Sequence, residues 1–287
     1  MESQTKMIRK IIATVIVLAL VISGTLGYTL YSAFKLPENH PGAYQKSVEL
    51  KEKIVVCMGD SITHGRVSHN YVDELSTRFA DQGFRFVNAG INGQLAYNLV
   101  QRVDPIVEID PDYITILIGT NDVLGTLSQA QADQYISSQS LPQAPDREWY
   151  EANLTQLVEG LQSRTKAKIA LISLPPVTEN PSHRGYTRAA EYSEFVRRLA
   201  EQHNLTYLPL NEQLDEKLKE KIHNPPQELD LGTMTEAIFR HYALVRDWDE
   251  VADANDMAFL TDGVHLSKRG ASVVTDLIGD FLTRPLE

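Results

Sequence analysis

Short apolar runs that alternate with amphipathic stretches limit what this chain can fold into. Five runs have the length and content of buried strands, namely 54–58, 85–88, 113–118, 168–173 and 205–208. Between the first two, Val72, Leu75 and Phe79 recur at helical spacing and predict a helix over 71–82, which Gly83 ends with a left-handed cap. Such alternation is typical of βα units around a parallel sheet, so we expect one α/β domain.

Similar spacing predicts further helices. They are 96–104, 147–164, 184–203 and 266–282. The stretch 223–258 fits the alternation less well, because it interrupts the path from the last predicted strand to the last predicted helix. After the break at Pro225 and Pro226 it carries one predicted helix, 233–245, and then an acidic segment. We therefore expect an insertion here.

The N-terminus has a different character from the rest of the chain. Three basic residues precede an apolar run, 11–30, and a helix of about 20 residues spans a hydrocarbon core of about 30 Å. A cleaved signal peptide usually has an apolar centre of only about 7–15 residues, although the small residues at 23–27 would permit cleavage. We predict a transmembrane anchor over 11–31 and keep a signal peptide as the alternative.

The basic residues also predict the orientation of the anchor. Lys6, Arg9 and Lys10 precede the apolar run, whereas Lys35 alone follows it closely, and positive charges favour the cytoplasmic side. Segment 1–10 is therefore expected in the cytoplasm, with the rest of the chain outside. After cleavage of a signal peptide the rest would instead be secreted.

Beyond the anchor, the chain divides into two parts. The stretch 32–52 is polar, contains proline and shows no periodicity, so we predict a stalk. The domain is then expected to occupy 53–287. Cys57, the only cysteine, excludes a disulfide within the chain, and its place in an apolar run predicts a buried core residue.

The charge of the chain excludes some partners. The net charge is −11, although the first ten residues are basic. Such acidity disfavours nucleic acid as a partner, and it also disfavours tight docking to an anionic lipid surface. Composition does not predict the oligomeric state.

Polar motifs follow the predicted strands at their carboxyl ends. These motifs are 59–61, 88–93 and 119–122, together with 262–267 at the start of the last predicted helix. Parallel strands end at the same edge of their sheet, where ligands bind. The four loops should therefore meet at one rim, and the insertion 223–258 should lie near it.

Three residues of these motifs have the types of a nucleophilic triad. A serine hydroxyl needs a positioned base, which a third group orients. Asp262 and His265 lie on a loop that enters a helix, so the carboxylate can accept from Nδ1 while Nε2 faces Ser61. The predicted catalytic residues are Ser61, Asp262 and His265.

Acyl transfer through a serine also needs donors for an anionic intermediate. Three are available in the motifs: the backbone N–H of Ser61, the backbone N–H of Gly90 and the side-chain amide of Asn121. Without a Cβ, Gly90 would let the backbone approach a substrate. We therefore predict that these three residues form an oxyanion hole.

Together the blocks resemble those of the SGNH hydrolases, the GDSL esterase/lipase superfamily, in a membrane-anchored, bacterial-type form. The positions that match its nucleophile, oxyanion glycine, oxyanion asparagine and terminal Asp-x-x-His are Ser61, Gly90, Asn121, Asp262 and His265. The blocks occur in the order of the family and leave the anchor and stalk outside. The resemblance implies a flavodoxin-like three-layer α/β/α sandwich of about five parallel strands. It also implies hydrolysis of esters without a metal.

We therefore predict a serine ester hydrolase that cleaves acetyl or other short acyl esters of carbohydrates or lipids, through an acyl-enzyme on Ser61 and without a cofactor. One alternative is an O-acyltransferase on envelope glycans, in which a sugar hydroxyl replaces water because the site excludes water. Another is a non-catalytic glycan- or lipid-binding module. The histidines at 183, 203, 223 and 241 lack the spacing of metal ligands, so no metal site is expected.

Other polar residues of the motifs have plainer interpretations. His64 is expected to touch substrate at the rim or to be exposed on the surface. Asp60 and Asp122 are expected to bond loop N–H groups rather than transfer protons. Asn92 could bond substrate or hold its own turn, and we favour the turn.

Overall fold

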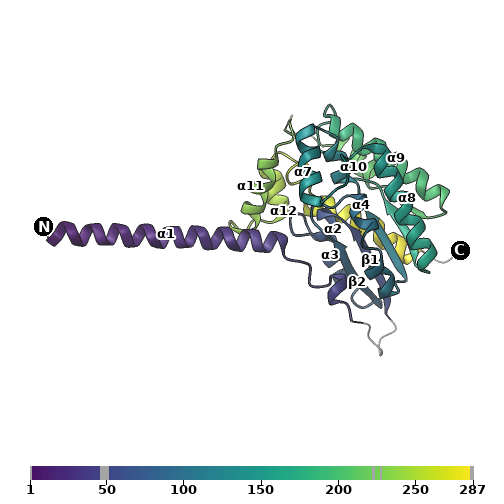
Figure 1. Ribbon diagram of the computed structural model, residues 1–287, viewed down its shortest axis with the longest axis horizontal. Coiled ribbons are helices and arrows are strands. Elements are labelled where there is room, and N and C mark those ends of the chain that lie inside the picture. Colours follow the sequence, from purple (N-terminus) through teal and green to yellow (C-terminus); the bar gives the residue numbers. More distant parts are fainter. Residues whose placement is uncertain (1, 46–51, 222–223, 227, 285–287) are drawn as a thin grey trace.

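A sheet of five parallel strands in the order β2-β1-β3-β4-β5 lies at the centre of the computed structural model, which describes residues 2–45, 52–221, 224–226 and 228–284 (Figure 1). The strands are β1 (Lys53–Gly59), β2 (Phe84–Gly90), β3 (Tyr113–Leu117), β4 (Lys168–Ile172) and β5 (Thr206–Leu208). Each overlaps one predicted run, with ends that differ by at most two residues. The predicted parallel sheet is confirmed.

Helices cover both faces of the sheet and give the predicted three layers. One face carries α4 (Ala96–Val100), α5 (Asp104–Ile109), α8 (Arg147–Arg164) and α9 (Arg184–Gln202). The other carries α3 (Tyr71–Arg78), α10 (Leu210–Lys219) and α13 (Lys268–Thr283). Val56 of β1 packs in the first core and Cys57 in the second, because successive residues of a strand point to opposite faces. Cys57 is buried as predicted, and burial raises the pKa of its thiol to about 12.

Helix boundaries differ from the prediction for local reasons. The predicted helix 96–104 ends earlier, at Val100, as α4. A second helix, α5, begins at Asp104, because Pro105 lacks an N–H and fits only the first turn of a helix. Helix α3 ends at Arg78, before its predicted end at 82. A turn follows, and Gly83 takes the left-handed conformation at its end.

The insertion holds two helices instead of one. The predicted helix 233–245 is α11 (Leu231–Tyr242), and the acidic segment after it forms α12 (Trp248–Ala254). Trp248 is buried and stacks on His241 with 3.9 Å between ring centroids, which joins the two helices. Residues 223 and 227 of the predicted insertion lie outside the described residues.

The long N-terminal helix α1 (Glu2–Phe34) contains the predicted anchor and extends past both of its ends. The part Lys6–Phe34 is long and apolar enough to cross a membrane, and its position also fits a signal sequence. The helix projects from the domain (Figure 1). Its last turns touch the domain, since Thr29 and Ala33 are buried there.

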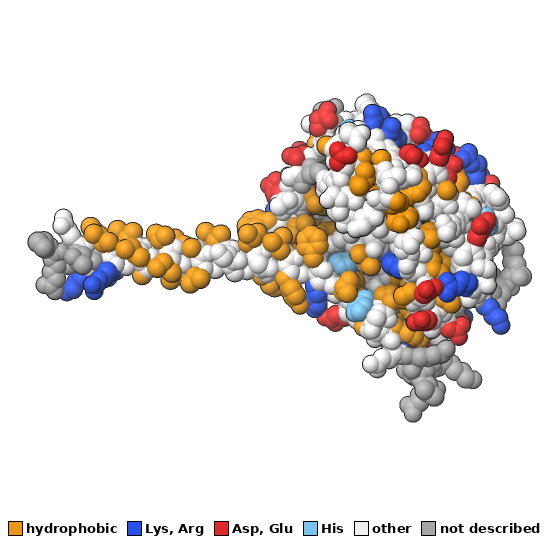
Figure 2. Space-filling view, in the orientation of Figure 1, with side chains coloured by type: hydrophobic (Ala, Val, Ile, Leu, Met, Phe, Trp, Pro, Cys, Tyr) orange, Lys and Arg blue, Asp and Glu red, His pale blue; other side chains and the backbone are white. Residues whose placement is uncertain are grey.

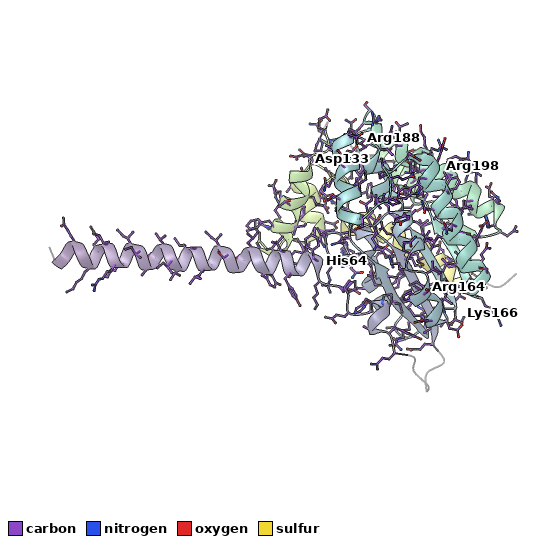
Figure 3. The ribbon with its side chains drawn as sticks, in the orientation of Figure 1. His64, Asp133, Arg164, Lys166, Arg188 and Arg198 are labelled. Atoms are coloured by element: carbon purple, nitrogen blue, oxygen red, sulfur yellow. The ribbon has the colours of Figure 1, made fainter. Side chains whose placement is uncertain are left out.

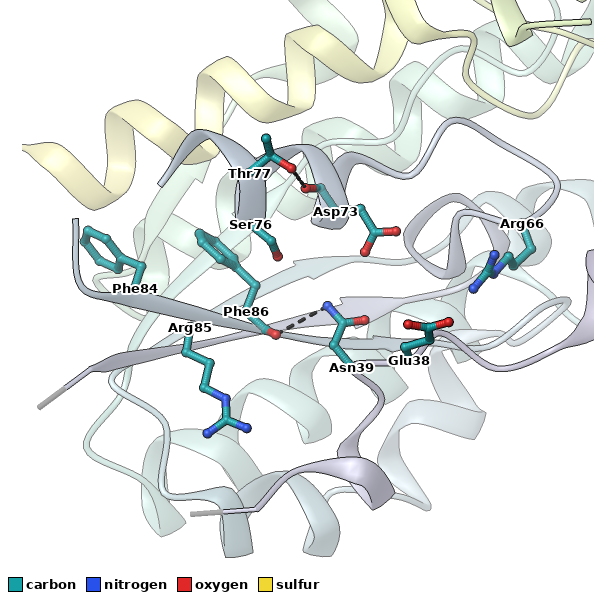
Figure 4. A pocket seen from close by; sticks show the side chains of 9 residues that line it. All are labelled: Glu38, Asn39, Arg66, Asp73, Ser76, Thr77, Phe84, Arg85 and Phe86. Carbon is teal, nitrogen blue, oxygen red and sulfur yellow. Dashed lines mark hydrogen bonds between the residues drawn. The ribbon is translucent and has the colours of Figure 1, made fainter. Parts of the chain in front are cut away.

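The segment predicted as a stalk lies against the domain as far as it is described, with residues 46–51 outside the described residues. The Asn88 N–H donates to the Asn39 carbonyl oxygen at 3.0 Å. The Asn39 side-chain amide donates to the Phe86 carbonyl oxygen at 3.3 Å (Figure 4). Tyr44 packs against the core. The chain therefore runs from α1 along β2, and the domain is held close to the end of α1.

The loop that leads into α13 is held by one buried carboxylate. Glu179 accepts backbone hydrogen bonds of 2.7 Å each from three consecutive residues, Ala258, Phe259 and Leu260. Hydrogen bonds to an ionised acceptor are roughly twice as strong as neutral ones. This carboxylate therefore fixes the start of the loop.

Glu179→Gln should destabilise the protein, because the new NH2 group must face a backbone N–H in place of an accepting oxygen. We expect the free energy of unfolding to fall by about 1–3 kcal/mol, the cost of a buried donor without an acceptor. Thermal unfolding of the purified chain in detergent measures the change. Glu216→Gln, at an exposed position of α10, is the matched control. Equal midpoints for the two variants would contradict this role of Glu179.

Candidate active site

The predicted loops meet at one cavity of about 260 Å³ beside the carboxyl edge of the sheet. Ser61 lies at the start of α2 (Ser61–His64), and Asn121 lies in the first turn of α6 (Thr120–Gly125). Asp262 and His265 come from the loop before α13. All four side chains line the cavity.

Two other groups of side chains complete the cavity. Helix α7 (Gln129–Gln139) contributes polar groups, namely Gln134, Tyr135, Ser138 and Gln139. Helix α1, the loop after α2 and helix α11 contribute apolar groups, namely Phe34, Val67, Met234 and Ile238. The cavity is therefore polar on the α7 side and apolar on the side next to α1.

A continuous line of hydrogen bonds joins the three predicted triad residues. His265 Nδ1 donates to Asp262 Oδ2 at 2.7 Å, which leaves Nε2 as the acceptor for the Ser61 hydroxyl at 2.8 Å. The second carboxylate oxygen, Asp262 Oδ1, accepts the backbone N–H groups of Val264 and His265, each at 2.9 Å. The carboxylate is thus fixed by its own loop, and it fixes the imidazole.

Burial and the pairing of Asp262 with His265 together determine the charges of these two side chains. Burial raises the pKa of the Asp262 carboxyl, but the neighbouring His265 and the hydrogen bonds hold it below its ordinary value. Burial lowers the pKa of the His265 imidazole, but the Asp262 carboxylate raises it above its ordinary value. The site therefore favours an imidazolium beside a carboxylate, the state that forms when the serine loses its proton.

Asp60 and Asp122 bond loop N–H groups, as the sequence predicts. Asp60 Oδ1 accepts the Ile62 N–H at 2.9 Å and so caps α2, which makes Ser61 the first residue of that helix. Asp122 Oδ2 accepts the Ala96 N–H at 3.1 Å. Burial raises the pKa of Asp60 to about 6 and that of Asp122 to about 7.

Two hydrogen bonds orient the side-chain amide of Asn121. Its Oδ1 accepts the Tyr135 hydroxyl at 2.7 Å, and its Nδ2 donates to the Gln94 carbonyl oxygen at 2.9 Å. An amide nitrogen carries two N–H groups, so a second one is available for a ligand. Tyr135 was not predicted from the sequence, because it lies in a helix without a clear periodicity.

The structure does not place Gly90 where an oxyanion donor is needed. The Gly90 N–H donates to Asn88 Oδ1 at 3.0 Å, and Gly90 is not among the described residues that line the cavity. A Cβ on Gly90 would lie 2.1 Å from the His64 backbone nitrogen, so glycine is needed there for the close approach of α2 to β2. The glycine that lines the cavity is Gly93, at a φ of 76°.

The prediction for His64 is wrong, and so is the favoured one for Asn92, which does line the cavity. His64, labelled in Figure 3, is buried at the end of α2, and burial with the charge of Arg66 lowers its pKa to about 4. It is not exposed, nor is it one of the described residues of the cavity wall. Asn92 holds the end of α1 rather than its own turn, since its side-chain amide donates to the Ala33 carbonyl oxygen at 3.0 Å.

Arg102 binds the ends of two strands, and this role was not predicted from the sequence. Its guanidinium donates to the Gly59 carbonyl oxygen at 3.1 Å, the Ala89 carbonyl oxygen at 2.7 Å and Gln94 Oε1 at 2.6 Å. Burial lowers its pKa to about 10. An arginine in an amphipathic stretch usually lies on the surface, so its burial depends on the folded chain.

A larger groove, of about 630 Å³, holds none of the predicted site residues. It lies between α3, β2 and the segment that follows α1 (Figure 4). Its lining includes the charged residues Glu38, Arg66, Asp73 and Arg85. Within the described parts of the chain, no group of three His, Cys, Asp or Glu side chains could hold a metal ion.

Solved structures share the fold of the chain. The acetylxylan esterase Axe2 from Geobacillus stearothermophilus is 21% identical, with a TM-score of 0.56 over 84% of this chain and 98% of that chain. A mutant of the same enzyme, described as an acetyl-xylooligosaccharide esterase, is 19% identical, with a TM-score of 0.59 over the same shares. LAE5, an α/β hydrolase from the metagenome of Lake Arreo in Spain, is 22% identical, with a TM-score of 0.54 over 80% and 94%. At such identities the likeness shows the fold alone.

The comparison of sequences shows the family. No curated protein matches the chain. Residues 57–273, more than half of the chain, match the model of the GDSL-like lipase/acylhydrolase family. The matched range contains the Ser61, Asp262 and His265 that the structure joins by hydrogen bonds. The chain therefore belongs to the GDSL-like lipase/acylhydrolase family of the SGNH superfamily and is a serine-type carboxylic ester hydrolase.

Proposed function

We propose that this hydrolase cleaves acetyl, or similarly short, acyl esters of carbohydrates through an acyl-enzyme on Ser61. The observation that carries the proposal is the line of hydrogen bonds from Asp262 through His265 to Ser61, on the wall of a cavity. A binding module without catalysis would not need this line. An O-acyltransferase would need a site that excludes water, and no feature of the described residues favours one.

The proposed reaction uses each triad residue in one role. Ser61 Oγ attacks the ester carbonyl carbon while His265 Nε2 takes the hydroxyl proton and Asp262 stabilises the imidazolium. His265 then gives this proton to the oxygen of the leaving alcohol as the ester C–O bond breaks. A water molecule that loses its proton to the same imidazole attacks the acyl-enzyme, and the acid is released.

For the oxyanion we assign three donors: the Ser61 N–H, the Asn121 side-chain amide and the Gly93 N–H. Gly93 replaces Gly90 in this role because it lines the cavity with Ser61 and Asn121. Its N–H has no hydrogen-bond partner among the described residues. A Cβ at this position would lie 2.6 Å from the Gln139 amide nitrogen, and its positive φ also favours glycine.

Two features support a small acyl group on a sugar. The cavity of about 260 Å³ lies below the roughly 300–1,000 Å³ of pockets that enclose drug-sized ligands, and this size favours a small acyl group. The amide and hydroxyl groups that α7 contributes can hydrogen-bond sugar hydroxyls. Axe2, which shares the fold, is an acetylxylan esterase.

The proposed setting is outside a membrane. We assign segment 1–10 to the cytoplasm, 11–31 to the membrane, 32–52 to the connection and 53–287 to the hydrolase domain. The charges before the apolar run support this orientation. The packing of Ala33 against the domain supports an anchor that is retained, because cleavage as a signal peptide would remove this contact.

Within the hydrolase domain, we assign the choice of substrate to the part of the insertion 223–258 that lines the cavity. Four of its described residues line the cavity, namely Leu229, Asp230, Met234 and Ile238. Since these side chains stand beside the catalytic serine, changes in them would alter which alcohol or acyl group fits.

Ser61→Ala should lower kcat for nitrophenyl acetate by about 10⁴-fold or more, because it removes the nucleophile. The thermal midpoint should not fall, since the loss of one hydroxyl group leaves no larger cavity. For the wild-type chain, acetate release from acetylated xylo-oligosaccharides should exceed acid release from a lysophospholipid. Unchanged turnover by Ser61→Ala would refute the mechanism, and a preference for the lysophospholipid would refute the substrate class.

The pH dependence follows from the paired imidazole. His265 must be neutral to accept the serine proton, so kcat/KM should rise with pH as the imidazole loses its proton. Because Asp262 raises the pKa of His265, the midpoint should lie above about 6.5, the value of an unperturbed histidine. Asp262→Asn should move the His265 titration, followed by NMR, to lower pH. A shift to higher pH, or none, would contradict the pairing.

Tyr135→Phe should lower kcat by about tenfold with little change in KM, because the Asn121 amide loses its orienting donor. The loss of a whole oxyanion donor costs about 10²–10³ in rate, and here the donor remains but is less well held. Tyr207→Phe is the control, since Tyr207 donates to Glu212 and does not line the cavity within the described residues. If the two variants have the same kcat, Tyr135 does not position Asn121.

A further inference from the structure

The side of the domain next to α1 carries exposed apolar side chains. Among the described residues outside α1, the exposed large hydrophobic side chains are Leu36 (47%), Phe239 (43%), Leu244 (56%) and Val245 (85%). All four lie on segments that adjoin α1: one just after it, the others on α11 and the turn that follows α11. Figure 2 shows that the apolar surface of α1 continues onto the adjoining part of the domain. We call these four residues the apolar patch.

Helix α11 packs along the last turns of α1. Ala33 forms a buried cluster with Ile238 of α11 and with Val67, and Tyr242 at the end of α11 packs against the same cluster. Thr29 is buried as well, one turn before Ala33 on the same face of α1. The domain therefore covers one face of the last turns of α1.

The length of α1 places this contact at the surface of a bilayer. A hydrocarbon core of about 30 Å that begins after Lys10 ends about 20 residues later, near Leu30, at a rise of about 1.5 Å per residue. Thr29 then lies at the outer boundary of the core, with Ala33 in the headgroup region. This step rests on the proposed retention of α1 as an anchor. Because α11 packs beside these residues, it must lie at the same level.

The turn after α11 combines a strained backbone with apolar side chains that are exposed to water. Val245 has a φ of 55°, a left-handed conformation that is rare for a β-branched residue, and its side chain is 85% exposed. Backbone hydrogen bonds close this turn, from the Leu244 N–H to the Phe239 carbonyl oxygen and from the Arg246 N–H to the Arg240 carbonyl oxygen, while the Leu244 and Val245 side chains are exposed. Burial of these side chains in lipid would offset the cost.

Charged side chains beside the apolar patch are paired with one another: Lys35 with Glu38 at 3.5 Å, Arg240 with Glu236 at 2.6 Å and Arg246 with Glu250 at 3.1 Å. The basic residues labelled in Figure 3, namely Arg164, Lys166, Arg188 and Arg198, lie on the parts remote from α1. The net charge of −11 opposes attraction to anionic headgroups, so contact with lipid would depend on the apolar patch and not on charge.

The catalytic cavity adjoins this surface. Phe34, Met234 and Ile238 line the cavity, and they lie on the same two helices as the contact between α1 and α11. We propose that the apolar patch and the end of α1 form a lipid-contacting surface that seats the catalytic cavity on the outer face of the bilayer. The acyl ester would then be taken from glycans carried at that surface.

A fluorescent label at Val245 tests the contact directly. The full chain with Val245→Cys is labelled with an environment-sensitive fluorophore and reconstituted in phosphatidylcholine vesicles, while the buried Cys57 stays unlabelled. We expect blue-shifted emission, quenching by spin-labelled lipids and protection from aqueous iodide. A label at Glu216→Cys, on α10, should show the reverse. A Val245 label that is open to iodide and insensitive to the lipid quencher would overturn the proposal.

Two further outcomes distinguish failure of the proposed lipid-contacting surface from failure of the proposed anchor. A label at Leu18→Cys, inside α1, reports whether α1 itself lies in the bilayer. If it does while the Val245 label lies in water, the lipid-contacting surface is refuted and the anchor stands. If the Leu18 label lies in water, both are refuted. A Val245 label that is shielded from both quenchers would show that a second copy of the chain covers the patch, which also overturns the proposal.

Activity gives a second, independent test. The double variant Leu244→Glu with Val245→Glu should hydrolyse soluble nitrophenyl acetate at the wild-type rate, because neither side chain lines the cavity within the described residues. Its rate on an acetylated glycolipid in vesicles should fall more than about tenfold, because burial of each of the two aliphatic side chains corresponds to about tenfold or more. Leu244→Met with Val245→Ile keeps the surface apolar and is the matched control. Equal rates of the Glu variant and the wild type on the glycolipid would overturn the proposal. If the Glu variant loses activity on both substrates, the quenching of the Val245 label decides whether the apolar patch contacts lipid.

Discussion

The parallel pairing of β1 with both β2 and β3 is the constraint on which the site depends. Gly59, at the end of β1, is paired with Gly90 on one side and with Leu117 on the other, so three loops start from one edge of the sheet. Arg102 then binds the carbonyl oxygens at the ends of β1 and β2 and fixes the distance between their loops. The distance between the nucleophile and the oxyanion loop is therefore determined by the pairing of these strands and by Arg102.

Features that leave a local pattern could be predicted from the sequence. The strands are continuous apolar runs because helices bury both faces of the sheet. Asp262 and His265 are joined within one short loop, so their pairing could be expected from spacing. Helix α2, with 4 residues, and helix α6, with 6, are too short to show a period, and neither was predicted.

Features that depend on distant parts of the chain could not be predicted. Gly90 ends β2 and Gly93 lies in the loop that follows; the two differ because the backbone of α2 would meet a Cβ at Gly90 but not at Gly93. Tyr135 reaches Asn121 through a single hydrogen bond over 14 positions of the chain. Glu179 reaches the loop before α13 over about 80 positions. A single polar contact of this kind leaves no periodicity in the sequence.

The end of α1 forms part of the cavity wall and also belongs to the proposed membrane anchor. Lys6–Phe34 has 29 residues, about two turns more than a bilayer requires, and the domain packs against the last turns. In the proposed setting, Phe34 would stand about 6 Å above the hydrocarbon boundary near Leu30. A helix without a flexible joint would hold the cavity at that height. Glycans close to the membrane would then reach Ser61, whereas esters on distant polymers would not.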